Sequence, residues 1–109
     1  MAVRFMNMYV LVNKGDRISI GSSNPNFMIE EQVLEYKDGD MVYLCSDGII
    51  DQFGGEDIKR FKSKKLKHLL LSIHSETMQS QKEIIDNSFH TWRGVQDQTD
   101  DVAIIGIKL

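Results

Sequence analysis

The segment Met41-Val42-Tyr43-Leu44-Cys45-Ser46-Asp47-Gly48 is the most informative part of the sequence for the fold. Its first five residues form a continuous apolar run, which is typical of a central strand that is buried on both faces. Turn-forming residues precede it at positions 37–40, and the run ends abruptly at Ser-Asp-Gly. We therefore predict a β-sheet organised around this strand, with a polar loop directly after it.

The sequence before this stretch also predicts strands. Residues 5–12 alternate so that both faces of a strand would be largely apolar. Turn residues at 13–16 and a short strand at 17–20 follow, so the two strands are predicted to pair as a hairpin. Residues 21–26 predict a loop, and the imperfect alternation of residues 27–36 predicts a further strand.

The sequence after this stretch changes to the period of a helix. Ser63 is predicted to cap a first helix, whose apolar residues recur at helical spacing. These residues are Leu66, Leu69, Leu70 and Ile73. A second helix is predicted over residues 77–93, with Gly94 as its stop signal. Its apolar stripe consists of Met78, Ile85, Phe89 and Trp92. Residues 102–107 predict a final strand.

The order of these elements predicts the fold class. Strands, then two helices, then one last strand indicate an α+β fold with a mainly antiparallel sheet and both helices packed on one face. Nothing in the chain covers the other face, although the strands around Val10, Leu44 and Ile104 are apolar on both sides. Either that face packs on a second copy of the chain, or the chain is half of a larger fold.

The composition is that of an ordinary globular domain or a piece of one. The chain has 109 residues, of which 41% are hydrophobic, and its 13 basic and 16 acidic residues give a formal net charge of −3. One cysteine excludes a disulfide framework and a multi-cysteine zinc site, and it suits the cytoplasm. No apolar run approaches the ~20 residues of a membrane span, the start lacks a secretion signal, and the mild acidity gives no case for nucleic acid.

Carboxylates flank two of the predicted buried strands. Asp47 directly follows the most apolar strand, and Asp100 and Asp101 directly precede the last one. Carboxylates held at strand ends are the oxygen ligands that Mg²⁺ and Mn²⁺ require, and two such metals would activate a water for attack on a phosphoryl group. The local pattern leaves simpler alternatives open, since Asp-Gly is a common turn pair and Asp-Asp is common at a solvated loop end.

Four segments together resemble one family. Residues 39–51 resemble the "GDxxxLxSDGxxD/E" segment of SpoIIE-like bacterial protein phosphatases, members of the PPM class of metal-dependent Ser/Thr phosphatases with the type 2C fold. Residues 15–21 resemble the "GDxxPIG" hairpin of that branch, although Ser19 replaces the usual proline. The matches continue in residues 51–55, "DQFGG", and in residues 98–106, which resemble the closing "DDxTxxxx" strand with Ala103 in place of threonine.

The resemblance implies a fold, a reaction and a set of ligands. The fold would be part of an αββα sandwich, and the reaction would be hydrolysis of phosphoserine or phosphothreonine on a protein substrate by a metal-bridged hydroxide. In this family the positions of Asp47 and Asp100 hold Mn²⁺ or Mg²⁺ in a two-metal site, and Asp101 is a neighbouring candidate ligand. The parent protein would be the output of bacterial signal transduction, as in two-component regulation.

The family's earlier motifs have no counterpart in this chain. A "DGxGHG"-type segment supplies the bridging aspartate in the family, and nothing in residues 1–26 resembles it. Residues 1–109 are therefore interpreted as the C-terminal half of the phosphatase domain, with an incomplete metal site and no activity in isolation. The alternative is a non-catalytic interaction or regulatory module on the same scaffold. We also predict no membrane contact and self-association through the uncovered sheet face.

Other conspicuous residues have simpler interpretations. Cys45 lies in an apolar strand and is predicted to be an inert core thiol. Gly54-Gly55 is predicted to be a flexible loop, with a phosphate cradle as the alternative. The basic residues at 59–67 are predicted to form a solvated helix face, because no aromatic residue is interleaved on that side for base stacking, and anion binding is the alternative. The histidines at 68, 74 and 90 have no metal-ligand spacing.

Overall fold

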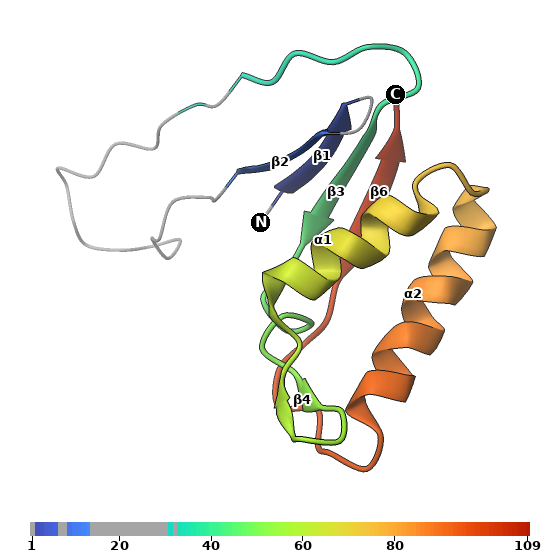
Figure 1. The fold of residues 1–109 in the computed structure, drawn as a ribbon. Helices are drawn as coiled ribbons and strands as arrows, with labels where there is room; N and C mark the ends of the chain where they lie inside the picture. Colours follow the sequence, from blue (N-terminus) through green and yellow to red (C-terminus); the bar gives the residue numbers. More distant parts are fainter. Residues whose placement is uncertain (1, 7–8, 14–30, 32) are drawn as a thin grey trace, which may run out of the picture.

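A computed structural model describes residues 2–6, 9–13, 31 and 33–109 of the chain. Its main sheet is antiparallel, with the strand order β2-β1-β3-β6 (Figure 1). The four strands are β1 (Ala2–Met6), β2 (Tyr9–Asn13), β3 (Met41–Cys45) and β6 (Ile104–Lys108). The last strand of the chain therefore pairs with β3, which is the strand that the sequence places at the centre.

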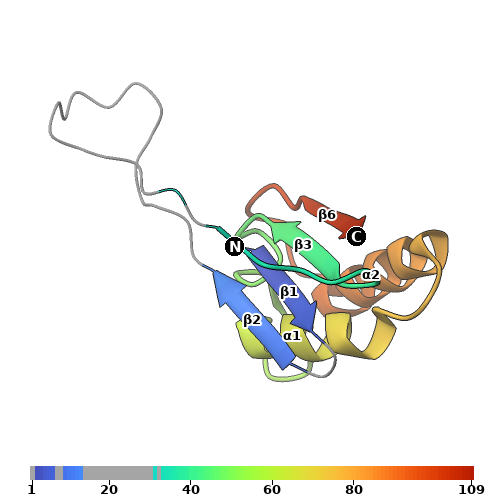
Figure 2. The ribbon, with the colours of Figure 1, turned by 90° about the horizontal axis from the view of Figure 1, so that it is seen from above.

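Two helices cover one face of this sheet, as the view from above shows (Figure 2). They are α1 (Lys62–Ile73) and α2 (Met78–Arg93). A separate hairpin of two short strands, β4 (Phe53–Gly54) and β5 (Lys59–Arg60), lies near the end of α2 (Figure 1). The predicted α+β fold with both helices on one face is confirmed. No helix in the described part of the chain is long and apolar enough to cross a membrane.

The core lies between the sheet and the helices. Side chains alternate along β3, so that Met41, Tyr43 and Cys45 are buried towards the helices. Leu66 and Leu70 from α1 are fully buried against them. Together with these five residues, the buried hydrophobic core consists of Ile49, Phe61, Ile73 and Phe89.

The opposite face of the same strands is apolar and open in the described structure. Leu44 of β3 is 45% exposed, and Ile105 and Ile107 of β6 are 57% and 40% exposed. The register places Leu44 beside Ile105, so these side chains form one continuous patch. This is the face for which the sequence pattern predicts no covering element within the chain.

The two helices start differently from each other, and one start differs from the prediction. Ser63 does not cap α1, since the cap position is Phe61, which is buried and makes no side-chain capping bond. Instead the Phe61 and Lys62 amides donate to loop carbonyls of Gln52 and Ile50, so tertiary contacts replace the side-chain cap. The second helix starts and ends as predicted, with a Thr77 cap that accepts the Ser80 N–H at 3.1 Å.

The strands predicted before residue 37 need correction. Residues 5–12 are not one strand, because β1 ends at Met6 and β2 begins at Tyr9, and the two pair antiparallel. A run that is apolar on both faces fits one strand or two paired strands, so its period does not distinguish them. The predicted strand at 17–20 lies outside the described residues. Of the strand predicted at 27–36, the described residues 31 and 33–36 are exposed and irregular.

Candidate functional site

The pairing of β3 and β6 continues beyond the strand ends and joins two loops. The Ser46 amide donates to the Ala103 carbonyl oxygen at 2.9 Å. The Ser46 hydroxyl accepts the Ala103 amide at 2.9 Å and donates to the Asp101 carbonyl oxygen at 3.1 Å. These bonds hold the loop that contains Asp47 beside the loop that contains Asp100 and Asp101.

A glycine lets the same two loops touch. A Cβ atom added to Gly48 would overlap with the carbonyl oxygen of Asp101 and would also meet the Val102 side chain at 3.1 Å. Gly48 is buried, and its φ lies outside the positive range, so close approach rather than turn geometry is what requires a glycine here. The Asp-Gly pair at 47–48 is thus more than a surface turn.

Hydrogen bonds within each loop fix its shape. In the first loop, the Asp51 amide donates to the Asp47 carbonyl oxygen at 3.0 Å. In the second loop, the Asp101 amide donates to Oδ1 of Asp100 at 2.8 Å, and the Gln98 side chain donates to the Asp100 carbonyl oxygen at 3.0 Å. The Asp100 carboxylate is therefore oriented by its own loop.

Gln52 is a buried polar residue that ties the loops to the helices. Its side-chain amide donates to the Asp97 and Phe53 carbonyl oxygens at 2.9 and 3.0 Å. Its own carbonyl oxygen accepts the indole N–H of Trp92 at 2.9 Å. Sequence reasoning did not assign a role to Gln52 or to Ser46. Their only signal was their place next to the candidate aspartates, because the contacts that they make are distant in sequence.

The candidate ligands lie on two adjacent loops that are bonded through Ser46, and their side chains are exposed to solvent. Asp47, Asp100 and Asp101 are all exposed. Carboxylate oxygens are the right donors for Mg²⁺ or Mn²⁺. However, the described residues contain no group of three or more His, Cys, Asp or Glu side chains placed to hold a metal ion. The carboxylate oxygens are therefore of the right chemical type for Mg²⁺ or Mn²⁺, while the described part of the chain does not assemble a complete two-metal site.

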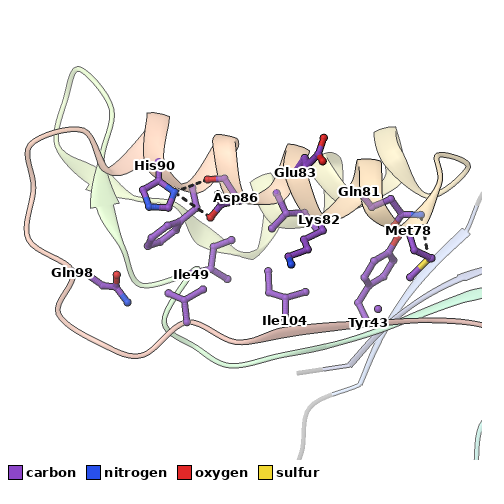
Figure 3. A pocket seen from close by; sticks show the side chains of 14 residues that line it. Tyr43, Ile49, Met78, Gln81, Lys82, Glu83, Asp86, His90, Gln98 and Ile104 are labelled. Carbon is purple, nitrogen blue, oxygen red and sulfur yellow. Dashed lines mark hydrogen bonds and ion pairs between the residues drawn. The ribbon is translucent and has the colours of Figure 1, made fainter.

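A groove of about 720 Å³ lies beside these loops, between α2 and β6 (Figure 3). Its lining is largely apolar and includes Ile49 and Ile104, while α2 contributes polar residues such as Lys82. On this wall the exposed side chains of His90 and Asp86 lie close together, with Nδ1 of His90 3.3 Å from Oδ1 of Asp86. None of the three candidate aspartates lines the groove, so it is a feature separate from the candidate metal loops.

Gly54 and Gly55 pack against an aromatic side chain. A Cβ atom added to Gly54 would overlap with the Trp92 carbonyl oxygen, and one added to Gly55 would lie 2.7 Å from the Trp92 ring. Gly55 also has a φ of +72° and donates its amide to the Trp92 carbonyl oxygen at 2.9 Å. The pair is part of a packed hairpin, which differs from the predicted flexible loop, and the bonded Gly55 amide does not support a phosphate cradle.

Two aromatic rings lie against the basic side chains, contrary to the sequence interpretation. The Lys65 ammonium lies 3.6 Å from the centroid of the Trp92 ring, and the Arg60 guanidinium lies 5.6 Å from that of Phe53. Both are cation–π contacts. The sequence could not show them, because the partners are up to 27 positions apart and meet only through the hairpin and α2.

The remaining reactive side chains have structural surroundings. Cys45 is buried, and burial raises the pKa of its thiol, so the thiol stays protonated and unreactive at neutral pH. The three histidines are exposed. Tyr43 is buried, and its hydroxyl donates to the Gln81 side-chain oxygen, while Gln81 donates to the Glu76 carbonyl oxygen at 2.9 Å. These contacts indicate packing roles.

Comparisons with known proteins agree with this architecture. The family model described as "Stage II sporulation protein E (SpoIIE)" matches residues 7–109. Among solved structures, the SiaA-PP2C domain of Pseudomonas aeruginosa is similar, with a TM-score of 0.85 and 24% sequence identity. The similarity covers 99% of this chain and 42% of that one, so this chain spans less than half of the solved chain. The comparison with curated proteins finds no significant match.

Proposed function

The chain belongs to the family of stage II sporulation protein E, and we propose that it forms the C-terminal half of a metal-dependent phosphoserine/phosphothreonine protein phosphatase domain. One structural observation supports this proposal above the others. The two loops with the candidate metal ligands are paired through Ser46 and are in van der Waals contact at Gly48. Two acidic loops with independent surface roles would not need this close approach.

In this proposal, Asp47 and Asp100 each contribute a carboxylate to a Mn²⁺ or Mg²⁺ site, with Asp101 beside them. A bound metal would supply a water of lowered pKa for attack on a phosphoryl group. Ser46 and Gly48 act as positioning residues, because they fix the distance between the two loops. The ligands that complete the site would come from the other half of the domain, which is why we expect residues 1–109 alone to be inactive.

Activity of the chain tests that expectation. The measurement is hydrolysis of p-nitrophenyl phosphate with Mn²⁺, using the chain and its Asp47→Asn variant. We expect no turnover above the Mn²⁺ blank for either protein. Clear turnover by the chain that disappears in Asp47→Asn would show that residues 1–109 hold a complete active site, and the half-domain interpretation would then be wrong.

Metal binding tests the assigned ligands independently of turnover. Mn²⁺ loses its free-ion electron paramagnetic resonance signal on binding, so a titration of the chain gives its affinity directly. We expect weak binding that Asp47→Asn and Asp100→Asn each weaken further. Asp86→Asn is the matched control, because Asp86 is an exposed carboxylate on α2 outside both loops. An equal loss in the control would remove the assignment.

A non-catalytic module on the phosphatase scaffold is the second candidate. It is favoured by the observation that the described residues form no group of three metal-ligating side chains. The parent reading frame distinguishes the two candidates. An Asp-Gly-x-Gly segment upstream of Asp47 supports the phosphatase, and its absence supports the module.

The biological setting is part of the proposal. A parent phosphatase would act on a phosphorylated protein in the cytoplasm as the output of a signalling protein. The substrate would reach the paired loops from the solvent side, where the candidate aspartates are exposed. Incubation of the parent protein with a phosphoserine protein and Mn²⁺, followed by measurement of released phosphate, tests this setting.

A further inference from the structure

The first helix and the hairpin before it concentrate positive charge that the candidate metal loops do not use. Residues 58–75 contain six of the 13 Lys and Arg residues and no Asp or Glu. The rest of the chain has seven basic and 16 acidic residues, a net charge of −9, so the positive charge of the sequence is concentrated in this segment. We call these six basic residues the basic surface; they are Lys59, Arg60, Lys62, Lys64, Lys65 and Lys67.

The basic surface faces solvent and is little neutralised within the described part of the chain. Five of its side chains are exposed, and Lys67 is half-buried. Asp57 lies 4.0 Å from Lys59 in an exposed pair, a type of contact that contributes little to stability. No other described carboxylate lies within ion-pair distance of the basic surface. Most of its charge is thus free to act on a partner.

The placement of these lysines works against the helix that carries them. The N-terminal end of a helix has a partial positive charge, which acidic side chains stabilise and basic ones oppose. The first turn of α1 contains Lys62, Lys64 and Lys65 and no acidic residue. A helix that needed only a solvated outer face would not require this arrangement. An anionic partner would offset the repulsion between these lysines and the positive end of the α1 dipole, and this stabilisation would add to its binding affinity.

We propose that the basic surface docks an acidic segment of a partner protein. Lys64 and Lys67 are three positions apart and therefore lie on the same side of α1. Leu71 follows one turn later on that side and is 40% exposed, and Ile58, at the hairpin end, is 54% exposed. Cations accompanied by exposed apolar residues complement a short segment whose carboxylates are flanked by apolar side chains.

A nucleic acid fits this surface less well than an acidic protein segment. Base stacking needs open aromatic faces, yet Lys65 lies over the Trp92 ring and Arg60 lies over Phe53. A long polyanion would also extend beyond the basic surface and be repelled by the net charge of −9 on the rest of the chain. A short acidic segment avoids both problems. The proposal is independent of whether the chain is part of an active phosphatase.

Fluorescence anisotropy tests the proposal on the chain as it stands. The probe is a fluorescein-labelled peptide of eight glutamates with a leucine at each end. We expect binding at 0.01 M ionic strength that weakens at least about tenfold at 0.15 M. The reason is that the screening length shortens from about 30 Å to about 8 Å between these two ionic strengths. Lys64→Glu/Lys67→Glu should weaken binding by at least about tenfold, because it reverses two charges on one side of α1.

Matched variants keep the result interpretable. Lys37→Glu/Lys82→Glu makes the same charge change at two exposed lysines outside the basic surface and should bind almost as tightly as the wild type. The thermal midpoint of Lys64→Glu/Lys67→Glu should not fall, since an acid in the first turn favours α1. If that variant nevertheless unfolds, Lys64→Gln/Lys67→Gln takes its place and should still weaken binding.

Three results would overturn the proposal. The first is no binding of the peptide at low salt. The second is an equal loss of binding in the control variant, which would indicate an effect of net charge alone. The third is tighter binding of an oligothymidylate of equal charge, which would identify nucleic acid as the partner class.

Discussion

The two faces of the β3–β6 strand pair are built from similar residues and have different surroundings. On the helix side, Tyr43 and Met41 are each 1% exposed, while on the other side Leu44 and Ile105 are 45% and 57% exposed. Both faces are apolar, so hydrophobicity does not explain the difference. The difference arises because α1 and α2 pack on one side, and no described element packs on the other.

This contrast indicates where the stability of the chain comes from. Apolar surface stabilises a fold only when folding removes it from water, by about 25 cal/mol per Å². On the helix side, folding removes nearly all of the Tyr43 surface from solvent. On the opposite side, which we call the bare face and which is formed by Leu44, Ile105 and Ile107, folding removes only about half of the Leu44 surface. An apolar face left open is characteristic of a surface that another layer or another molecule covers.

The largest expected difference is between two leucine truncations. Leu66→Ala removes a side chain that is fully buried under α1, and it should lower the free energy of unfolding by about 2–5 kcal/mol. Leu44→Ala makes the same chemical change on the bare face and should cost less than about 1 kcal/mol. Urea unfolding followed by circular dichroism measures both. Equal losses would mean that the two faces are equally buried in solution.

A second prediction concerns the end of the strand pair, where backbone contact replaces side-chain packing. Gly48→Ala forces a methyl group against the Asp101 carbonyl, so we expect a loss of about 1–3 kcal/mol. The two loops should also separate, which would weaken Mn²⁺ binding beyond the effect on stability. Gly39→Ala is the control, because no atom lies within 4 Å of its added Cβ, although its φ of +91° adds strain. Unchanged Mn²⁺ affinity in Gly48→Ala would argue against positioning by this contact.

A third prediction uses the buried hydroxyl on the helix side. Tyr43→Phe leaves the Gln81 oxygen without the hydrogen bond from Tyr43, and this should cost about 1–3 kcal/mol at neutral pH. Burial, and secondarily the nearby Cys45 thiolate, raises the pKa of Tyr43 from about 10 to about 12. The native state therefore keeps a proton that the unfolded state releases.

The sign of the pH effect follows from that retained proton. The contribution of Tyr43 to stability is fully present below pH 10 and is lost as the pH rises through about 12. The deficit of Tyr43→Phe relative to the wild type should therefore shrink between these two values. Tyr36→Phe serves as the control, since Tyr36 is 60% exposed, and its difference from the wild type should stay constant with pH. A constant deficit for Tyr43→Phe would contradict the raised pKa.

The sequence predicted those parts of the molecule that local pattern determines. The boundaries of β3 follow from a continuous apolar run bounded by turn residues, and α2 follows from a periodic apolar stripe and the stop signal at Gly94. The start of α1 could not be predicted from Ser63, because its first amides bond to the carbonyls of Ile50 and Gln52. Such partners meet only after the chain has folded back.

The candidate site shows the same limit. The positions of Asp47 and Asp100 at strand ends were visible in the sequence, and their neighbourhood follows once β3 pairs with β6. What locks the loops together was not visible, because the Ser46 hydroxyl bridges 57 positions to the Ala103 amide. Gln81, 2% exposed on a helix with a mainly apolar inner face, was also missed, since its partner Tyr43 is 38 positions away.

The smallest expected effect on stability is on the bare face, where the expected effect on assembly is large. Leu44→Lys/Ile105→Lys places two charges on side chains that are already about half exposed, so the free energy of unfolding should change by only about 0.5–1 kcal/mol. Association through this face would require burying the new charges, which is costly when they are unpaired.

We expect the wild type to form dimers or larger species in multi-angle light scattering and this variant to be monomeric. Leu71→Lys, at an exposed leucine of α1, should leave the wild-type assembly intact. A wild type that stays monomeric at high concentration would contradict this prediction and would count against the interpretation that a covering half of the fold is missing.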